Sequence, residues 1–233
     1  MSFKFRWVPF FATLCVVTLG IVLGQWQTSR AQYKEALATQ LHTRQTLPPI
    51  VLGADIIRAA DATYRSMRVQ GEFVKEWPVY LDNRPYQGRP GVYVLMPFKI
   101  LHTQTYVLVA RGWMPLQSRT TKIVLNTPEG IQTIEGVAQP GMGRVFELGV
   151  QTNLAPQALV QNIDVNALAQ ATKFFMQPFV LLQLQGVSDG LVRDWPQPSD
   201  GVDMHRGYAF QWYALACMAG LFFIVTGCRR ETK

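Results

Sequence analysis

Cysteine and histidine are scarce in this sequence, and their positions exclude several kinds of chemistry. The 233 residues include 3 cysteines, Cys15, Cys217 and Cys228, so the long middle of the chain has none. That region therefore has no disulfide, thiol redox chemistry, cysteine nucleophile or thiolate metal site. The 3 histidines are His42, His102 and His205. They show neither H-x-x-x-H nor H-E-x-x-H spacing, so no zinc site is predicted.

Charged residues are absent from two long apolar runs. Trp7 to Leu23 carries no charge, and at about 1.5 Å per helical residue it approaches the roughly 30 Å of a bilayer's hydrocarbon core. Tyr208 to Gly227 is also free of charge and ends just before Arg229 and Arg230. Both runs are predicted to span a membrane. We favour a retained anchor over a cleaved signal peptide for the first, and a span over a buried core helix for the second.

The basic residues indicate an orientation. Five of the 22 Lys and Arg residues, but one of the 15 acidic residues, lie outside the two spans in the terminal tails. More than half of the net charge of +7 is therefore in the tails, which predicts cytoplasmic termini and a loop on the opposite side. The small remaining charge of the loop argues against nucleic-acid binding and is compatible with weak attraction to anionic lipid.

The loop itself predicts a helical stem followed by a β-rich domain. Residues 25–47 favour a helix that continues the first span and ends at Pro48 and Pro49. Short β-like runs follow, separated by Gly, Pro and Asn, with one helix over 164–171 capped by Asp164. The predicted strands are Thr63–Phe73, Pro78–Asp82, Gly91–Leu101, Gln104–Trp113, Gly130–Ala138 and Gln177–Gly186. His102 is expected at a hairpin turn.

The predicted architecture is a membrane-anchored α+β protein, with two transmembrane helices flanking one β-rich, largely antiparallel periplasmic domain. The expected segments are 1–6 cytoplasmic tail, 7–24 first span, 25–47 helical stem, 48–194 β-rich domain, 195–207 linker, 208–227 second span and 228–233 cytoplasmic tail.

Two aromatic segments meet the expected outer membrane surface, Gly24 to Arg30 and His205 to Trp212. An aromatic belt explains most of their residues. It does not explain Gln211, because an amide within a span should face a partner or a cavity. His205 is the only histidine expected beside the bilayer, and a neutral imidazole there could ligate heme iron, with Arg30 or Arg206 on the propionates. Both interpretations remain open on the residues alone.

A cluster of turn-forming residues extends from Leu81 to Gly91. Asp82 and Arg84 could act as an acid and an anchor, but no second carboxylate or base lies nearby in the sequence. Asp, Asn, Gly and Pro between strands usually form turns, which is the interpretation we favour. The sequence has no Ser/His/Asp arrangement, G-x-S-x-G elbow or P-loop.

Four motifs in order, between two spans, resemble the Surfeit locus protein 1 family, whose members are assembly factors for heme-copper cytochrome oxidases. The first consists of Gly24, Trp26, Gln27 and Arg30. The second is Leu81 to Arg84 with Gly88, Pro90 and Gly91, and the third is Arg111 to Trp113 with Pro115. The fourth is His205, Gly207 to Ala209, Gln211 and Trp212, with Leu215 and Ala216.

The resemblance implies a two-span inner-membrane protein that matures the heme a centre of oxidase subunit I. An enzyme acting on heme or peptide is not favoured, because the residues offer no plausible catalytic set. It implies heme a as a transiently bound cofactor, with His205 as the candidate iron ligand. Trp26, Arg30, Tyr208, Gln211 and Trp212 are the remaining expected pocket residues. Subunit I, heme a synthase and membrane lipid are the expected partners. Ala110 and Met204 stand where the family often has asparagine, and the second departure bears on how His205 is oriented. The rival hypothesis is a scaffold that holds nascent subunit I open without binding heme.

Overall fold

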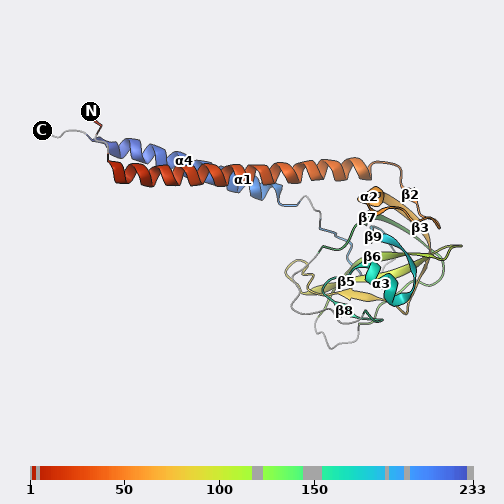
Figure 1. Ribbon diagram of the computed structural model, residues 1–233. Helices are drawn as coiled ribbons and strands as arrows, with labels where there is room; N and C mark the ends of the chain where they lie inside the picture. Colours follow the sequence, from red (N-terminus) through yellow and green to blue (C-terminus); the bar gives the residue numbers. More distant parts are fainter. Residues whose placement is uncertain are drawn as a thin grey trace. The chain divides into compact units, whose positions relative to one another are not determined.

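The computed structural model describes residues 2–3, 6–116, 123–143, 154–186, 189–196 and 200–229, and at 2–5 and 228–229 no side chain is described. The chain forms two compact units (Figure 1). The first, here called the helical unit, comprises Met1–Gln40 and Pro196–Lys233. The second, here called the β-domain, comprises Leu41–Trp195.

Helix α1 (Trp7–Gln45) is a single uninterrupted helix of 39 residues. It joins the predicted first span and the predicted stem, and it stops just before Pro48 and Pro49, which cannot continue it. Helix α4 (Val202–Gly227) begins six residues earlier than the predicted span, so His205 lies in its first turns rather than in a linker. A two-residue antiparallel pair, β1 (Ser2–Phe3) with β10 (Cys228–Arg229), joins the chain just outside these helices.

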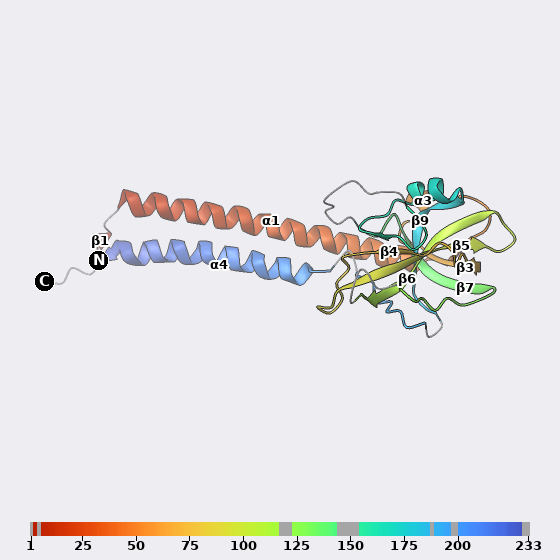
Figure 2. The ribbon, with the colours of Figure 1, turned by 90° about the horizontal axis from the view of Figure 1, so that it is seen from below.

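The two helices are long and apolar enough to cross a membrane, and they run antiparallel, side by side (Figure 2). Only 11% of the most apolar window of each is buried, which disfavours a core helix. Small residues allow the close approach. A Cβ on Gly20 would lie 2.9 Å from the Ala216 Cβ, and one on Gly24 would lie 2.6 Å from the Tyr213 ring. This is the usual way in which membrane helices pack.

The β-domain contains one sheet, and each predicted strand has a counterpart in it. Its strands are β2 (Ile50–Val51), β3 (Ser66–Phe73), β4 (Val79–Leu81), β5 (Gly91–Ile100), β6 (Thr105–Pro115), β7 (Gln132–Gln139), β8 (Leu159–Val160) and β9 (Phe175–Gln183). Two helices accompany them, α2 (Ala59–Ala62) and α3 (Val165–Thr172). The Asp164 carboxylate accepts from the Asn166 amide and caps α3, as predicted. The sequence did not predict β2, β8 or α2.

The sheet closes into a barrel. Strands β3, β7, β9, β6 and β5 are neighbours in that order, and β5 also pairs with β3, through Ile100 to Gly71 and Phe98 to Phe73. Gly71 permits this closure, because a Cβ there would lie 1.9 Å from the Lys99 carbonyl oxygen. Closure removes the exposed edges that these strands would otherwise present. Most pairings are antiparallel, but β6 and β9, at the centre of the sheet, are parallel.

Two apolar clusters lie on the two faces of the barrel wall. One draws residues from all five barrel strands, including Val107, Val109 and Phe179, and therefore fills the interior. The other lies outside, under α3, and includes Leu108 and Val180. Neighbouring residues of β6 and β9 thus alternate between two buried faces. Trp195, assigned from the sequence to the linker, is 7% exposed in the outer cluster, because its indole packs there and donates to the Gln183 carbonyl.

Candidate functional site

His205 faces α1 from the first turns of α4. Its Nδ1 lies 2.7 Å from Oε1 of Gln27, and the residue is partly buried. The two positions meet because each is one helical turn from a small buried residue, Gly24 on α1 and Ala209 on α4. The amide oxygen only accepts hydrogen bonds, so this contact is a hydrogen bond in the tautomer of His205 that has its proton on Nδ1. Among the described residues, no hydrogen bond to Nε2 of His205 is found.

Further polar side chains lie beside this pair. The Tyr213 hydroxyl donates to Oε1 of Gln25 at 3.4 Å and lies 3.5 Å from the Thr28 hydroxyl. Thr28 itself donates to the Gly24 carbonyl at 2.9 Å. Polar residues of α1 within the motif at Gly24 to Arg30 thus meet the N-terminal half of α4. Such bonds between helices hold a pair together where water is excluded.

Ionic contacts close the same end of the helical unit. Arg206 pairs with Glu35, and Lys34 donates to the Asp200 carbonyl. A mostly apolar cavity of about 410 Å³ lies beside the Arg206–Glu35 pair and is bordered by Ala31, Ala209 and the rings of Phe210 and Tyr213. His205 is not among the residues that line this cavity. Arg206, whose guanidinium was a predicted partner of a heme propionate, is thus already paired with the carboxylate of Glu35.

The six predicted site residues do not form one pocket. Trp212 is partly buried, near the helix interface with His205, whereas Tyr208 is 46% exposed on the flank of α4. Trp26 and Gln211 each lie about 200° around their helices from the buried Gly24 and Ala209, so they point away from the interface. Arg30 is exposed as well and lies 5.5 Å from the ring of Tyr33 on its own helix.

Gln211, whose polarity predicts a partner or a cavity, is exposed on the outer face of α4 rather than on the face toward α1. Gln27 and Tyr213 make the contacts that sequence reasoning missed. The signal was available in the helical period: from the small residues Gly24 and Ala209, steps of three or four residues reach Gln27 and Tyr213. Gln211 lies two residues from Ala209, which places it on the opposite side.

The cluster at Leu81 to Gly91 is a hairpin loop, as predicted, between β4 and β5. Gln87 and Gly88 have φ of 48° and 75°, and the flanking Tyr86 and Arg89 exchange both backbone hydrogen bonds. This geometry is a type I′ turn. Arg84 donates to the Gln161 carbonyl at 3.2 Å, and burial lowers its pKa. His102 has φ of 59° in the β5–β6 turn, also as predicted.

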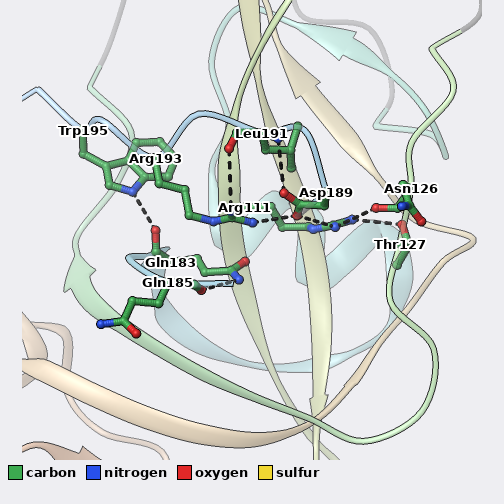
Figure 3. A network of polar contacts seen from close by, with 9 residues as sticks. All are labelled: Arg111, Asn126, Thr127, Gln183, Gln185, Asp189, Leu191, Arg193 and Trp195. Atoms are coloured by element: carbon green, nitrogen blue, oxygen red, sulfur yellow. Dashed lines mark hydrogen bonds and ion pairs between the residues drawn. The ribbon is translucent and has the colours of Figure 1, made fainter. Parts of the chain in front are cut away.

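Arg111, from the third motif, is fully buried and fixes two loops to the barrel (Figure 3). Its guanidinium donates to the Thr127 hydroxyl and the Asn126 carbonyl, both at 2.9 Å, and to Asp189 at 3.0 Å. Arg193 shares the same Asp189 oxygen at 2.6 Å. Burial lowers the pKa of Arg111, and the adjacent Asp189 carboxylate opposes that shift. The motif thus has a structural role within the β-domain.

These features define a class of protein: a closed β-barrel domain between two helices that are each long and apolar enough to cross a membrane. Within the described residues, no group of three or more His, Cys, Asp or Glu side chains is placed to hold a metal ion. Residues 14–217 match the SURF1 family, and the chain therefore belongs to this family.

Several named proteins are similar to this chain in sequence. A SURF1-like protein of Rickettsia felis is 32% identical over 131 residues, which are 54% of this chain and 55% of the relative. Surfeit locus protein 1 of Rattus norvegicus is 28% identical over 167 residues, 64% of this chain and 53% of the relative. Cytochrome oxidase assembly protein SHY1 of Saccharomyces cerevisiae is 29% identical over 98 residues, 41% of this chain and 25% of the relative. The chain thus spans about half the length of the first two relatives.

Proposed function

We propose that this protein is an assembly factor for a heme-copper cytochrome oxidase, without a catalytic role. It binds heme a through His205 and delivers it to subunit I or stabilises its insertion there. Membership of the SURF1 family supports the assembly role, since one relative is named a cytochrome oxidase assembly protein. Heme a is the cargo in this proposal, and heme a synthase is the partner from which the protein would receive it.

The observation that carries the heme proposal is the hydrogen bond between His205 and Gln27. A heme iron is commonly held by a histidine ring nitrogen. His205 has one ring nitrogen bonded to the neighbouring helix at 2.7 Å, so its ring is held in place while the residue is only partly buried. The residues fit the axial bond better than the propionates, because Arg206 pairs with Glu35 and Arg30 points away from α4.

We further propose an inner-membrane protein with two spans, both termini cytoplasmic and the β-domain periplasmic. The basic residues that flank the spans support this orientation, since the inner ends carry Arg6, Arg229 and Arg230. The polar end of the helical unit, with His205, would then lie near the outer surface of the bilayer. Membrane lipid would contact the exposed apolar faces of α1 and α4.

A scaffold is the second candidate function, and the exposed amide of Gln211 favours it. Gln211 lies one turn inside the apolar part of α4 and faces outward, together with Phe210. An amide in a bilayer gains from a hydrogen bond to another helix. Nascent subunit I, a membrane protein in this proposal, could supply that partner without any heme being held.

Heme a binding by the purified full-length protein separates the two functions. The wild type, His205→Ala and His102→Ala would be produced in cells that make heme a, and the absorption spectrum and heme content compared. The carrier predicts heme a on the wild type and on His102→Ala, and a lost or altered spectrum for His205→Ala. His102 is the matched control because it lies in a turn of the β-domain. Equal spectra and stoichiometry in all three proteins would favour the scaffold.

A further inference from the structure

We infer that Gln27 is a positioning residue: it holds His205 in the Nδ1–H tautomer and leaves Nε2 as the nitrogen that binds metal. The inference deepens the proposed heme site and rests on it for its biological meaning. Its chemical content, the tautomer of one imidazole, is independent of whether heme binds.

The first step is the direction of that bond. Oε1 of Gln27 lies 2.7 Å from Nδ1 of His205, a short separation for a nitrogen donor and an oxygen acceptor. A carbonyl-type oxygen has no proton to give, so the hydrogen bond forms in the tautomer that has its proton on Nδ1. A neutral imidazole with a proton on Nδ1 has its lone pair on Nε2. The ring is thus prepared to ligate through Nε2.

The second step is that the bond is held from both sides. His205 and Gln27 come from different helices, so each backbone fixes one end of the hydrogen bond. Gly24, one turn from Gln27, packs on Tyr213, and Tyr213 bonds Gln25 in turn. Partners of this kind orient a histidine ring and raise its basicity as a ligand.

Gln25 provides a matched control for Gln27. Both are glutamines of α1, two residues apart, but Gln25 is exposed and accepts from Tyr213 rather than from His205. Gln27→Leu removes the acceptor, whereas Gln25→Leu makes the same substitution without touching the imidazole. Gln27→Glu keeps an acceptor oxygen at the same distance from the backbone and is the conservative rescue.

The test is ¹⁵N NMR of the heme-free, full-length protein in detergent with ¹⁵N-labelled histidine. The chain has only 3 histidines, so His205→Ala assigns the signal directly. We expect protonated Nδ1 and unprotonated Nε2 in the wild type, Gln25→Leu and Gln27→Glu. Gln27→Leu should shift toward the Nε2–H form, while the His42 and His102 signals stay unchanged. An Nε2–H tautomer in the wild type, or no change in Gln27→Leu, would overturn the inference.

Heme a affinity gives the second readout. Loss of such a partner lowers metal affinity typically 10- to 100-fold. We therefore expect Gln27→Leu to weaken heme a binding by about 10-fold or more, and Gln27→Glu and Gln25→Leu to bind like the wild type. If the tautomer behaves as expected and the wild type binds no heme a, the proposed function fails and the positioning of His205 stands. If heme a binds through His205 equally with and without Gln27, the positioning role is wrong.

Discussion

The two units of this protein use polar side chains in opposite ways. In the β-domain, Arg111 is fully buried, and its donors reach a hydroxyl, a carbonyl and a carboxylate from two loops. In the helical unit, His205 is only partly buried, and among the described residues its ring is hydrogen-bonded to Gln27 alone. The two terminal guanidinium nitrogens of Arg111 are thus bonded within its own fold, which ties the two loops to the barrel. A side chain that is oriented but not fully occupied can take a ligand.

The largest expected effect in this comparison comes from Asp189→Ala in the β-domain. It leaves Arg111 and Arg193 buried together without the carboxylate that both contact. Removing one member of a buried ion pair typically costs about 3–5 kcal/mol of unfolding free energy. Urea unfolding of the purified full-length protein would measure it. Glu135→Ala, which breaks an exposed pair with Arg68, is the control and should cost at most about 1 kcal/mol. Equal costs would show that the buried network is not a main support of the fold.

The second prediction is that Gly71→Ala disturbs the closure of the barrel. The new Cβ would meet the Lys99 carbonyl oxygen, which is backbone and cannot move aside alone. The expected loss of unfolding free energy is about 3 kcal/mol, the upper end for an overpacked site. Gly53→Ala, in open space in the same unit, should be nearly neutral. A stable Gly71→Ala protein would mean that β3 and β5 do not pair as described.

The third prediction applies the same logic to the helical unit. Gly24→Leu should push the Tyr213 ring away and cost about 1–2 kcal/mol of helix association, since a ring can rotate where a backbone cannot. Gly220→Leu faces open space and should cost nothing. Cross-linking between cysteines placed at Phe10 and Phe223, whose rings lie 6.0 Å apart, would report helix pairing once the native cysteines are replaced. Equal cross-linking in both variants would contradict the packing.

The smallest expected effect is a change in how the free energy of unfolding falls at alkaline pH. Burial raises the pKa of Tyr80 and of Tyr93, while Arg111 and Arg84 respectively oppose the shift. A raised folded-state pKa favours the neutral phenol, so stability is intact below a pH of about 10 and falls as the pH rises beyond it. Tyr80→Phe and Tyr93→Phe should each flatten that fall. Unfolding free energies measured from pH 8 to 11 would show it, and unchanged slopes would count against the burial of these phenols.

Local patterns in the sequence were enough to place the strands, but not to pair them. Short β-like runs between Gly, Pro and Asn identified β3 and β7, and turn residues marked the loop that follows β4. Alternation says which faces are buried and does not say which strands are neighbours, so the parallel β6–β9 pair and the β3–β5 closure were not predicted. The ion pair of Arg111 with Asp189 joins residues 78 positions apart, and no local sequence pattern predicts such a contact.

The helical unit shows the same limit at a smaller scale. His205 was identified because it is the one histidine beside an apolar run, which is a compositional signal. Its partner Gln27 depends on the helical period of α1 and on how two helices meet, and the polarity of Gln211 carries no information about that partner. Steps of three and four residues from the buried small residues would have selected Gln27.

We propose that the polar residues of the β-domain maintain the fold, whereas His205 binds the heme a that the proposed function requires. The most direct test measures, in the same membranes, the abundance of this protein and the heme a content of the oxidase for wild type and His205→Ala. The account predicts normal abundance of the His205→Ala protein with a reduced heme a content. Normal abundance with an unchanged heme a content would contradict it.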